Sequence, residues 1–134
     1  DNEPFNLLMV HGSVKAINDY MVIDYPEAEV LQMMNSQKAD VLLCGHTHKP
    51  FHRVIKSDNV FKHVINIGSV GKPKDGDSRL CYAILELNKN TTPSNPEAIK
   101  VTFKRATYDV EKAAKAVENS EFSTSYADAL RIAK

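Results

Sequence analysis

Residues 39–51 read ADVLLCGHTHKPF, and within them the wholly apolar run VLLC at 41–44 stops at Gly45. A short apolar run that ends at a glycine is typical of a buried β-strand leading into a turn. Two histidines separated by one residue would point to opposite faces of a regular strand, whereas in a turn they can face two neighbouring metal ions. We therefore predict a central strand over 41–44 that delivers His46 and His48 to a candidate metal site.

A second apolar run, LLMV at 7–10, leads directly into His11. The ends of strands in α/β sheets are where loops gather side chains into a crevice, and imidazole is a common ligand for zinc and iron. The two spaced histidines alone are a moderate signal, which the strand ending in His11 and the glycine-rich loop at 68–78 strengthen. His52 and His63 fall within a predicted hairpin, and we interpret them as ordinary strand side chains.

The remaining pattern predicts alternating helices and strands. Apolar spacing and turn residues give a loop over 14–25, a helix from Pro26 to 36–38, hairpin strands over 51–55 and 60–67, strands over 80–87 and 99–105, a helix over 110–118 capped by Asp109, and a weaker helix over 124–133. We expect one α/β unit built on a single mixed sheet with helices on one face.

Composition bounds the function. The 134 residues are 43% hydrophobic, which suits one soluble globular unit. Seventeen basic and seventeen acidic residues cancel, which argues against a general nucleic-acid or membrane-surface binder. Cys44 and Cys81 both lie in apolar stretches, and we interpret them as buried thiols in a reducing cytoplasm, with a disulfide or a metal role as the alternative. No apolar run approaches the roughly 20 residues that span a bilayer, so we expect no membrane partner.

Several stretches together resemble the calcineurin-like metallophosphoesterases, especially their small bacterial and archaeal members. These stretches are LLMVHGS at 7–13, ADVLLCGHTHKPF at 39–51, VINIGSVGKPKDGD at 64–77, RLCYAILEL at 79–87 and KRATYDVEKAAKAV at 104–117. The GHTH stretch is the most specific of them. The resemblance implies a phosphatase or phosphodiesterase in which two divalent ions activate a hydroxide that attacks phosphorus, with manganese as the expected metal and iron, zinc or nickel as alternatives.

The resemblance also implies roles for individual residues. His11 and His46 would ligate one metal ion, and His48 would ligate the other. The residues expected near the substrate are Ser13, Asn66, Gly68 and Ser69. Ile67 stands where many relatives have proline, so the backbone path of that loop is expected to differ.

The first three motifs of the family do not precede the two found here. The family places DxH, GDxx and GNH elements before the two motifs found here, and neither Asp-x-His nor Gly-Asn-His occurs in the sequence. The resemblance therefore implies that residues 1–134 form the C-terminal portion of a four-layer αββα domain. The other ligands and the catalytic histidine would lie N-terminal to Leu7, in the same gene or a second chain, so this chain itself holds no catalytic residue. We expect it alone to bind metal weakly and to be inactive.

Other interpretations stay open. Some members of this superfamily are non-catalytic scaffolds for protein binding, and a chain without DxH and GNH suits that role. A structural zinc site would need four ligands, one more than the three histidines supply. Lys72, Lys74 and Arg79 either contact an anionic substrate or are simply solvated, and Tyr20 either walls the pocket or is a half-buried aromatic. A bare sheet face would need cover, from the missing half or from a second copy in a homo-oligomer.

Overall fold

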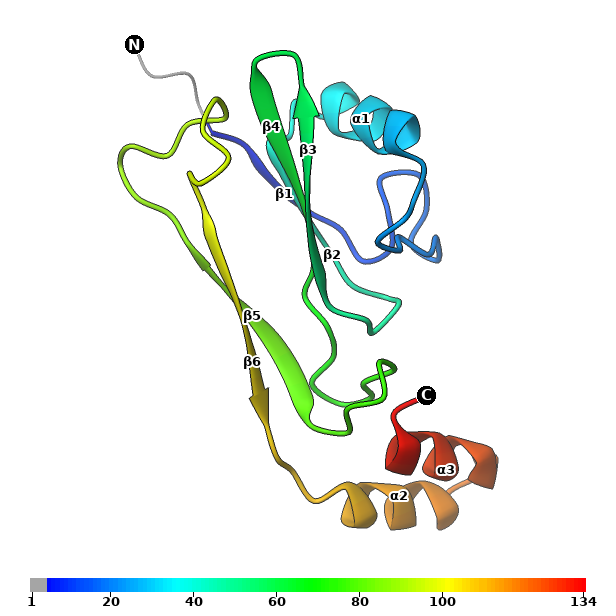
Figure 1. The fold of residues 1–134 in the computed structure, drawn as a ribbon. Coiled ribbons are helices and arrows are strands. Elements are labelled where there is room, and N and C mark those ends of the chain that lie inside the picture. The colour runs from blue at the N-terminus through cyan, green and yellow to red at the C-terminus, as the bar shows by residue number, and fades with distance from the viewer. Residues whose placement is uncertain (1–4) are drawn as a thin grey trace.

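The computed structural model describes residues 5–134, which form two β-sheets and three helices (Figure 1). The strands are β1 (Leu7–Met9), β2 (Val41–Cys44), β3 (Phe51–Ser57), β4 (Val60–Asn66), β5 (Leu80–Glu86) and β6 (Lys100–Ala106). The helices are α1 (Glu27–Ser36), α2 (Val110–Glu118) and α3 (Thr124–Ile132). Every predicted element is present, and the α/β class is confirmed.

The four-stranded sheet has the order β1-β2-β4-β3. Strands β1, β2 and β4 run parallel, while β3 returns antiparallel to β4 through the predicted hairpin. All four residues of β2 are buried, as expected for a continuous apolar run in a strand covered on both faces. The parallel pairing of β1 with β2 brings their carboxyl ends to the same edge of the sheet.

Helix α1 covers one face of this sheet. It begins at Glu27, one residue later than predicted, and Pro26 occupies the cap position with φ −52° and ψ 121°. Val30, Met33 and Met34 are buried against the sheet, in a core shared with Leu42, Val64 and Ile55. The spacing of these three side chains places them on one side of the helix, which explains the apolar contact.

The expectation of a single mixed sheet is wrong, because within residues 5–134 β5 and β6 pair only with each other, in a separate two-stranded sheet. Strand β4 already has β2 and β3 on its two sides, so it offers no free edge to the strand that follows it. Leu85, Ile99, Val101 and Phe103 pack instead against Val41, Leu43 and Ile65. The sheet face expected to be bare is therefore partly covered by this chain itself, opposite α1 (Figure 1).

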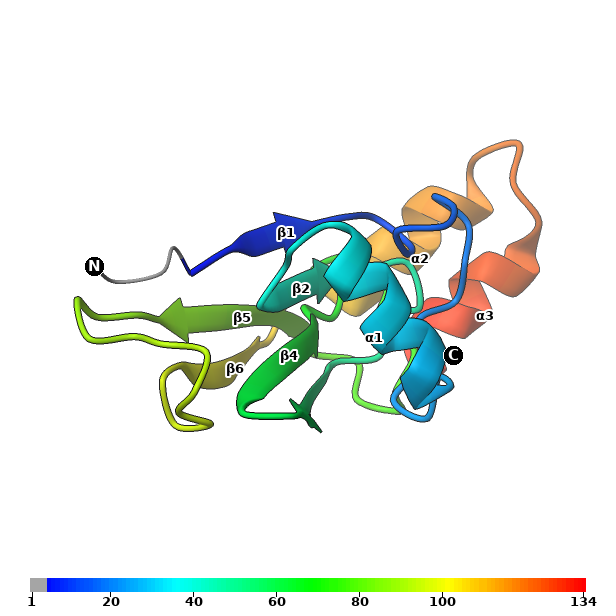
Figure 2. The ribbon, with the colours of Figure 1, turned by 90° about the horizontal axis from the view of Figure 1, so that it is seen from above.

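Helices α2 and α3 lie side by side at the end of the molecule away from the loop between β5 and β6 (Figure 2). The predicted cap is confirmed, since the Asp109 carboxylate accepts a hydrogen bond from the Lys112 backbone amide at 2.9 Å. Ala114, Ala127 and Leu130 are buried. None of the helices in residues 5–134 is long and apolar enough to cross a membrane.

Candidate metal centre

The candidate site forms where β1 and β2 end. Backbone hydrogen bonds continue the pairing past both strands, from the Val10 amide to the Leu43 carbonyl at 3.0 Å and from the Gly45 amide to the His11 carbonyl at 2.9 Å. His11 and the GHTH turn therefore leave the sheet side by side. The turn departs from strand geometry at both histidines, because φ is +61° at His46 and +59° at His48.

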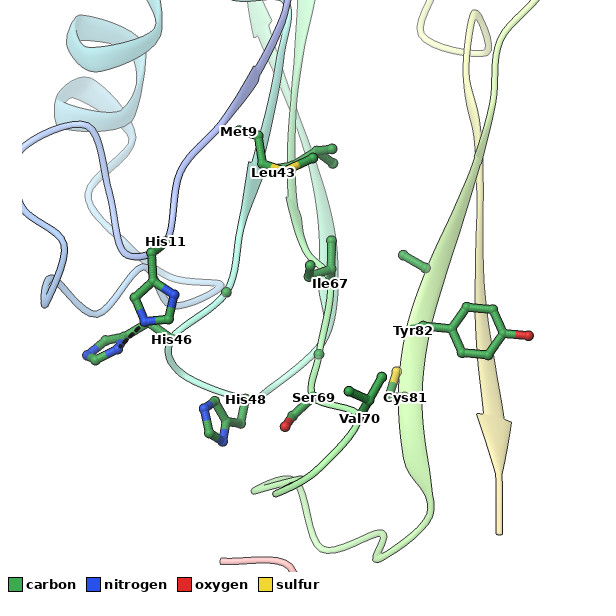
Figure 3. A pocket seen from close by; sticks show the side chains of 13 residues that line it. Met9, His11, Leu43, His46, His48, Ile67, Ser69, Val70, Cys81 and Tyr82 are labelled. Carbon is green, nitrogen blue, oxygen red and sulfur yellow. Dashed lines mark hydrogen bonds between the residues drawn. The ribbon is translucent and has the colours of Figure 1, made fainter. Parts of the chain in front are cut away.

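His11 and His46 face each other across this edge (Figure 3). Nε2 of His11 lies 3.0 Å from Nδ1 of His46, and the ring of Tyr20 lies 4.6 Å from the His46 ring, centroid to centroid. The other ring nitrogen of His46, Nε2, is buried and has no hydrogen-bond partner among the described residues. The two ring nitrogens therefore lie at hydrogen-bonding distance from each other.

His48 is oriented by a different contact. Its Nδ1 lies 2.7 Å from the backbone carbonyl of Lys72, and because a carbonyl only accepts, Nδ1 carries the proton and Nε2 carries the lone pair. Burial lowers the pKa of His48, while the Lys72 carbonyl opposes that shift. A neutral ring with its Nε2 lone pair available is the form that ligates a metal ion.

The side chain of Asn66 stabilises the GHTH turn through hydrogen bonds. Its fully buried side chain donates to the Gly45 carbonyl at 2.8 Å and to Thr47 Oγ1 at 2.9 Å, and it accepts from the Gly68 amide at 3.0 Å. Gly68 has φ +79°, and a Cβ there would lie 2.9 Å from the Cys81 side chain. Asn66 and Gly68 therefore shape the loops around the histidines.

The three histidines border a cavity of about 460 Å³ (Figure 3). Its other lining residues are mostly apolar, and they come from both sheets and the loop after β4: Met9, Leu43, Gly45, Ile67, Gly68, Ser69, Val70, Cys81, Tyr82 and Ala83. Sequence reasoning did not predict the wall from β5, because nothing in the sequence shows that β5 lies opposite the first sheet.

The residues expected near the substrate divide into two groups. Gly68 and Ser69 line the cavity. Asn66 lies behind the turn, and Ser13 is buried in its own loop, where Oγ accepts from the Lys15 amide at 3.0 Å. Tyr20 contacts His46 yet stays outside the cavity lining.

The charged residues considered as contacts for an anionic substrate lie in different places. Arg79 forms an ion pair with Asp77 at 2.7 Å. The Lys72 ammonium lies 4.6 Å from the ring centroid of Tyr126 on α3. Within residues 5–134, no three His, Cys, Asp or Glu side chains converge closely enough to hold a metal ion by themselves. The described chain therefore presents a pair of histidines and a separate third one.

Comparison with known proteins agrees with this architecture. The profile of the calcineurin-like phosphoesterase superfamily domain matches residues 1–90. An uncharacterized protein of Methanocaldococcus jannaschii is 32% identical over 85 residues, which cover 55% of this chain and 31% of that protein.

Two solved structures share the fold. A metallophosphoesterase of Sphaerobacter thermophilus has a TM-score of 0.73 and 23% identity, over 98% of this chain and 58% of that one. A hypothetical protein of Pyrococcus horikoshii has a TM-score of 0.68 and 18% identity, over 92% and 45%. The chain thus spans between 31% and 58% of the length of these three relatives. By the profile match over most of its length, the chain belongs to the calcineurin-like phosphoesterase superfamily.

Proposed function

We propose that residues 1–134 are part of a metal-dependent phosphoester hydrolase, in which His11 and His46 hold one divalent ion and His48 contributes to a second. The observation that carries this proposal is the approach of His11 Nε2 to His46 Nδ1 at 3.0 Å, at the ends of two parallel strands. Membership of the superfamily supports the same class of reaction.

The residues present fit such ions. Two imidazole nitrogens bound to one metal ion at about 2.1 Å each lie about 3.0 Å apart at a bond angle near 90° and about 3.4 Å apart at the tetrahedral angle. The 3.0 Å between His11 Nε2 and His46 Nδ1 lies at the lower end of this range. The bond between His48 Nδ1 and the Lys72 carbonyl is the kind of outer contact that fixes the ring orientation of a metal-ligating histidine.

The ions, when bound, would supply a hydroxide to attack phosphorus and would offset charge on the phosphate oxygens. The chain's own residues position these ligands. Asn66 fixes the turn that carries His46 and His48, and the apolar cavity walls lower the local dielectric constant, which strengthens interactions with a phosphate group.

Three histidines are an incomplete set, because a catalytic metal ion usually keeps about three protein ligands. We propose that the remaining ligands and the catalytic histidine lie N-terminal to Leu7 or on a second chain. The proposed metal is manganese, with iron, zinc or nickel as alternatives, and the substrate is a phosphorylated small molecule or a phosphodiester. The free, buried thiols of Cys44 and Cys81 fit a reducing cytoplasm.

Metal analysis of the intact protein tests this proposal. We expect about two divalent ions per protein, at least one of which is lost in His48→Ala, together with hydrolysis of a phosphodiester. His52→Ala is the control, because His52 lies on β3 outside the cavity. A protein that binds no divalent ion and hydrolyses no phosphoester would contradict the proposal and favour a scaffold.

A further inference from the structure

A second hollow of about 250 Å³ lies between the α2–α3 hairpin and the loop after β4. Five side chains line it: Lys72, Val117, Phe122, Tyr126 and Leu130. We call this hollow the aromatic pocket. It is not part of the histidine cavity, and none of the proposed metal ligands lies on α2 or α3.

Two aromatic side chains at this pocket are exposed to solvent. Phe122 is 70% exposed and Tyr126 is 50% exposed, and their rings meet edge to face with centroids 6.3 Å apart. A single exposed apolar side chain needs no explanation. Two exposed rings beside a hollow lined by Val117 and the buried Leu130 form a concave apolar surface of the kind that binds small molecules.

Lys72 connects the aromatic pocket to the candidate metal centre. Its backbone carbonyl accepts the hydrogen bond from His48, and its ammonium group lies over the ring of Tyr126. One residue therefore contacts the candidate metal centre through its backbone and the aromatic pocket through its side chain. A backbone hydrogen bond from Gly76 to the Ala133 carbonyl, at 3.1 Å, also ties the loop to the end of α3.

We propose that the aromatic pocket binds the base of a nucleoside phosphate whose phosphate group reaches the histidine cavity. This inference rests on the proposed function and names its substrate class. Every nucleobase has a flat face that stacks on aromatic side chains, and the Lys72 ammonium beside the rings attracts the phosphate of the same molecule. A ligand with a flat apolar ring at one end and an anion at the other matches both features.

Binding to the 134-residue chain in EDTA tests this without any hydrolysis. We expect adenosine monophosphate to shift the ring proton resonances of Phe122 and Tyr126 and to bind at least tenfold more tightly than ribose 5-phosphate. Equal affinity for these two ligands would overturn the proposal. Octyl phosphate binding as tightly as the nucleotide, with the same resonances shifted, would also overturn it, because the pocket would then select apolar surface without stacking.

Variants separate stacking from folding. Phe122→Ala and Tyr126→Ala should each weaken nucleotide binding by about 5- to 100-fold, while Tyr126→Phe keeps the ring and should bind normally. Ile132→Ala is the matched control, because Ile132 is an exposed apolar residue of α3 outside the pocket lining. Thermal unfolding of each variant verifies that it is folded. Unchanged affinity in both folded alanine variants would overturn the proposal.

Hydrolysis by the intact protein keeps the two proposals distinguishable. Turnover of ribose 5-phosphate, which has no base, tests the metal centre alone. If ribose 5-phosphate is hydrolysed and the nucleotide is neither bound nor hydrolysed better, the aromatic pocket proposal fails while the proposed function stands. If the nucleotide binds through Phe122 and Tyr126 but neither these phosphomonoesters nor a phosphodiester is hydrolysed, the reverse holds.

Discussion

Two histidine pairs in this chain have the same distance between ring nitrogens and different surroundings. His11 and His46 approach at 3.0 Å between ring nitrogens, and so do His52 and His63. The first pair follows the ends of parallel strands and borders a cavity. The second lies within the β3–β4 hairpin, where His63 is fully buried. A short distance between imidazoles therefore does not identify a metal site, whereas access from a cavity at a strand end supports one.

Each pair also contains one buried ring nitrogen without a hydrogen-bond partner among residues 5–134, Nε2 of His46 and Nε2 of His63. An unpaired buried polar atom costs stability, so both pairs carry a cost. In the first pair that cost accompanies a proposed site. In the second pair the unpaired nitrogen lies between two packed strands, and we expect it to make folding sensitive to pH.

The largest expected difference between the pairs is catalytic. In the intact protein, His46→Ala should lower kcat/KM on a phosphodiester by a factor of about 1,000 or more, because losing a ligand removes the ion and the hydroxide that it activates. His52→Ala should keep most of the activity. Steady-state kinetics with metal in excess measures both, and near wild-type turnover by His46→Ala would rule out its role as a ligand.

The second expected difference is the effect of acid on folding. Burial and, to a smaller extent, the neighbouring His52 lower the pKa of His63 to about 4, while Asp40 acts in the opposite direction. Burial also lowers the pKa of His52. His63 takes up its proton near pH 6.5 in the unfolded state and only near pH 4 in the folded state. The free energy of unfolding therefore keeps the full contribution of neutral His63 above pH 6.5 and loses it as the pH drops toward 4.

The loss from His63 is about 3 kcal/mol at most. Urea unfolding of the chain at several pH values between 7 and 4 measures it. His63→Leu removes this titration and should flatten the profile, with His52 contributing what remains. An unchanged slope between pH 6.5 and 4 in His63→Leu would show that other groups cause the acid sensitivity.

The third expected difference concerns the contacts that hold each histidine pair in position. The turn that carries His46 depends on the three hydrogen bonds of Asn66, whereas the second pair is held by the strand ladder. Asn66→Ala leaves buried partners unpaired and should lower the free energy of unfolding by about 1 to 3 kcal/mol. Asn35→Ala, at an exposed position of α1, is the control. Equal stability of the two variants would show that Asn66 does not support the turn.

Local sequence pattern predicted the elements but not how they assemble. The apolar runs that end at His11 and Gly45 identified both strands and the edge where the histidines meet, because a buried strand needs a continuous apolar run. Apolar spacing and the flanking turn residues identified β5 and β6 as strands, yet they carry no information about which strand each one pairs with. The contact between the Lys72 carbonyl and His48 was not predicted, because every residue has a backbone carbonyl and the sequence does not show which one lies beside a given histidine.

The smallest expected effect concerns metal binding by the 134-residue chain alone, where the first pair lacks its proposed additional ligands. Binding to the folded state stabilises it by RT ln(1 + [L]/Kd), so a millimolar site in a millimolar solution contributes only about 0.4 kcal/mol. Manganese prefers oxygen ligands, and the pair offers nitrogen. Melting scans with and without Mn²⁺ should therefore nearly coincide for the wild-type chain and for His46→Ala.

Zinc or nickel suits imidazole better and should raise the melting temperature of the wild type more than that of His46→Ala. His52→Ala should respond to these metals like the wild type. A large shift with Mn²⁺, or turnover by the chain alone, would show that residues 1–134 already hold a complete site whose ligands differ from those proposed.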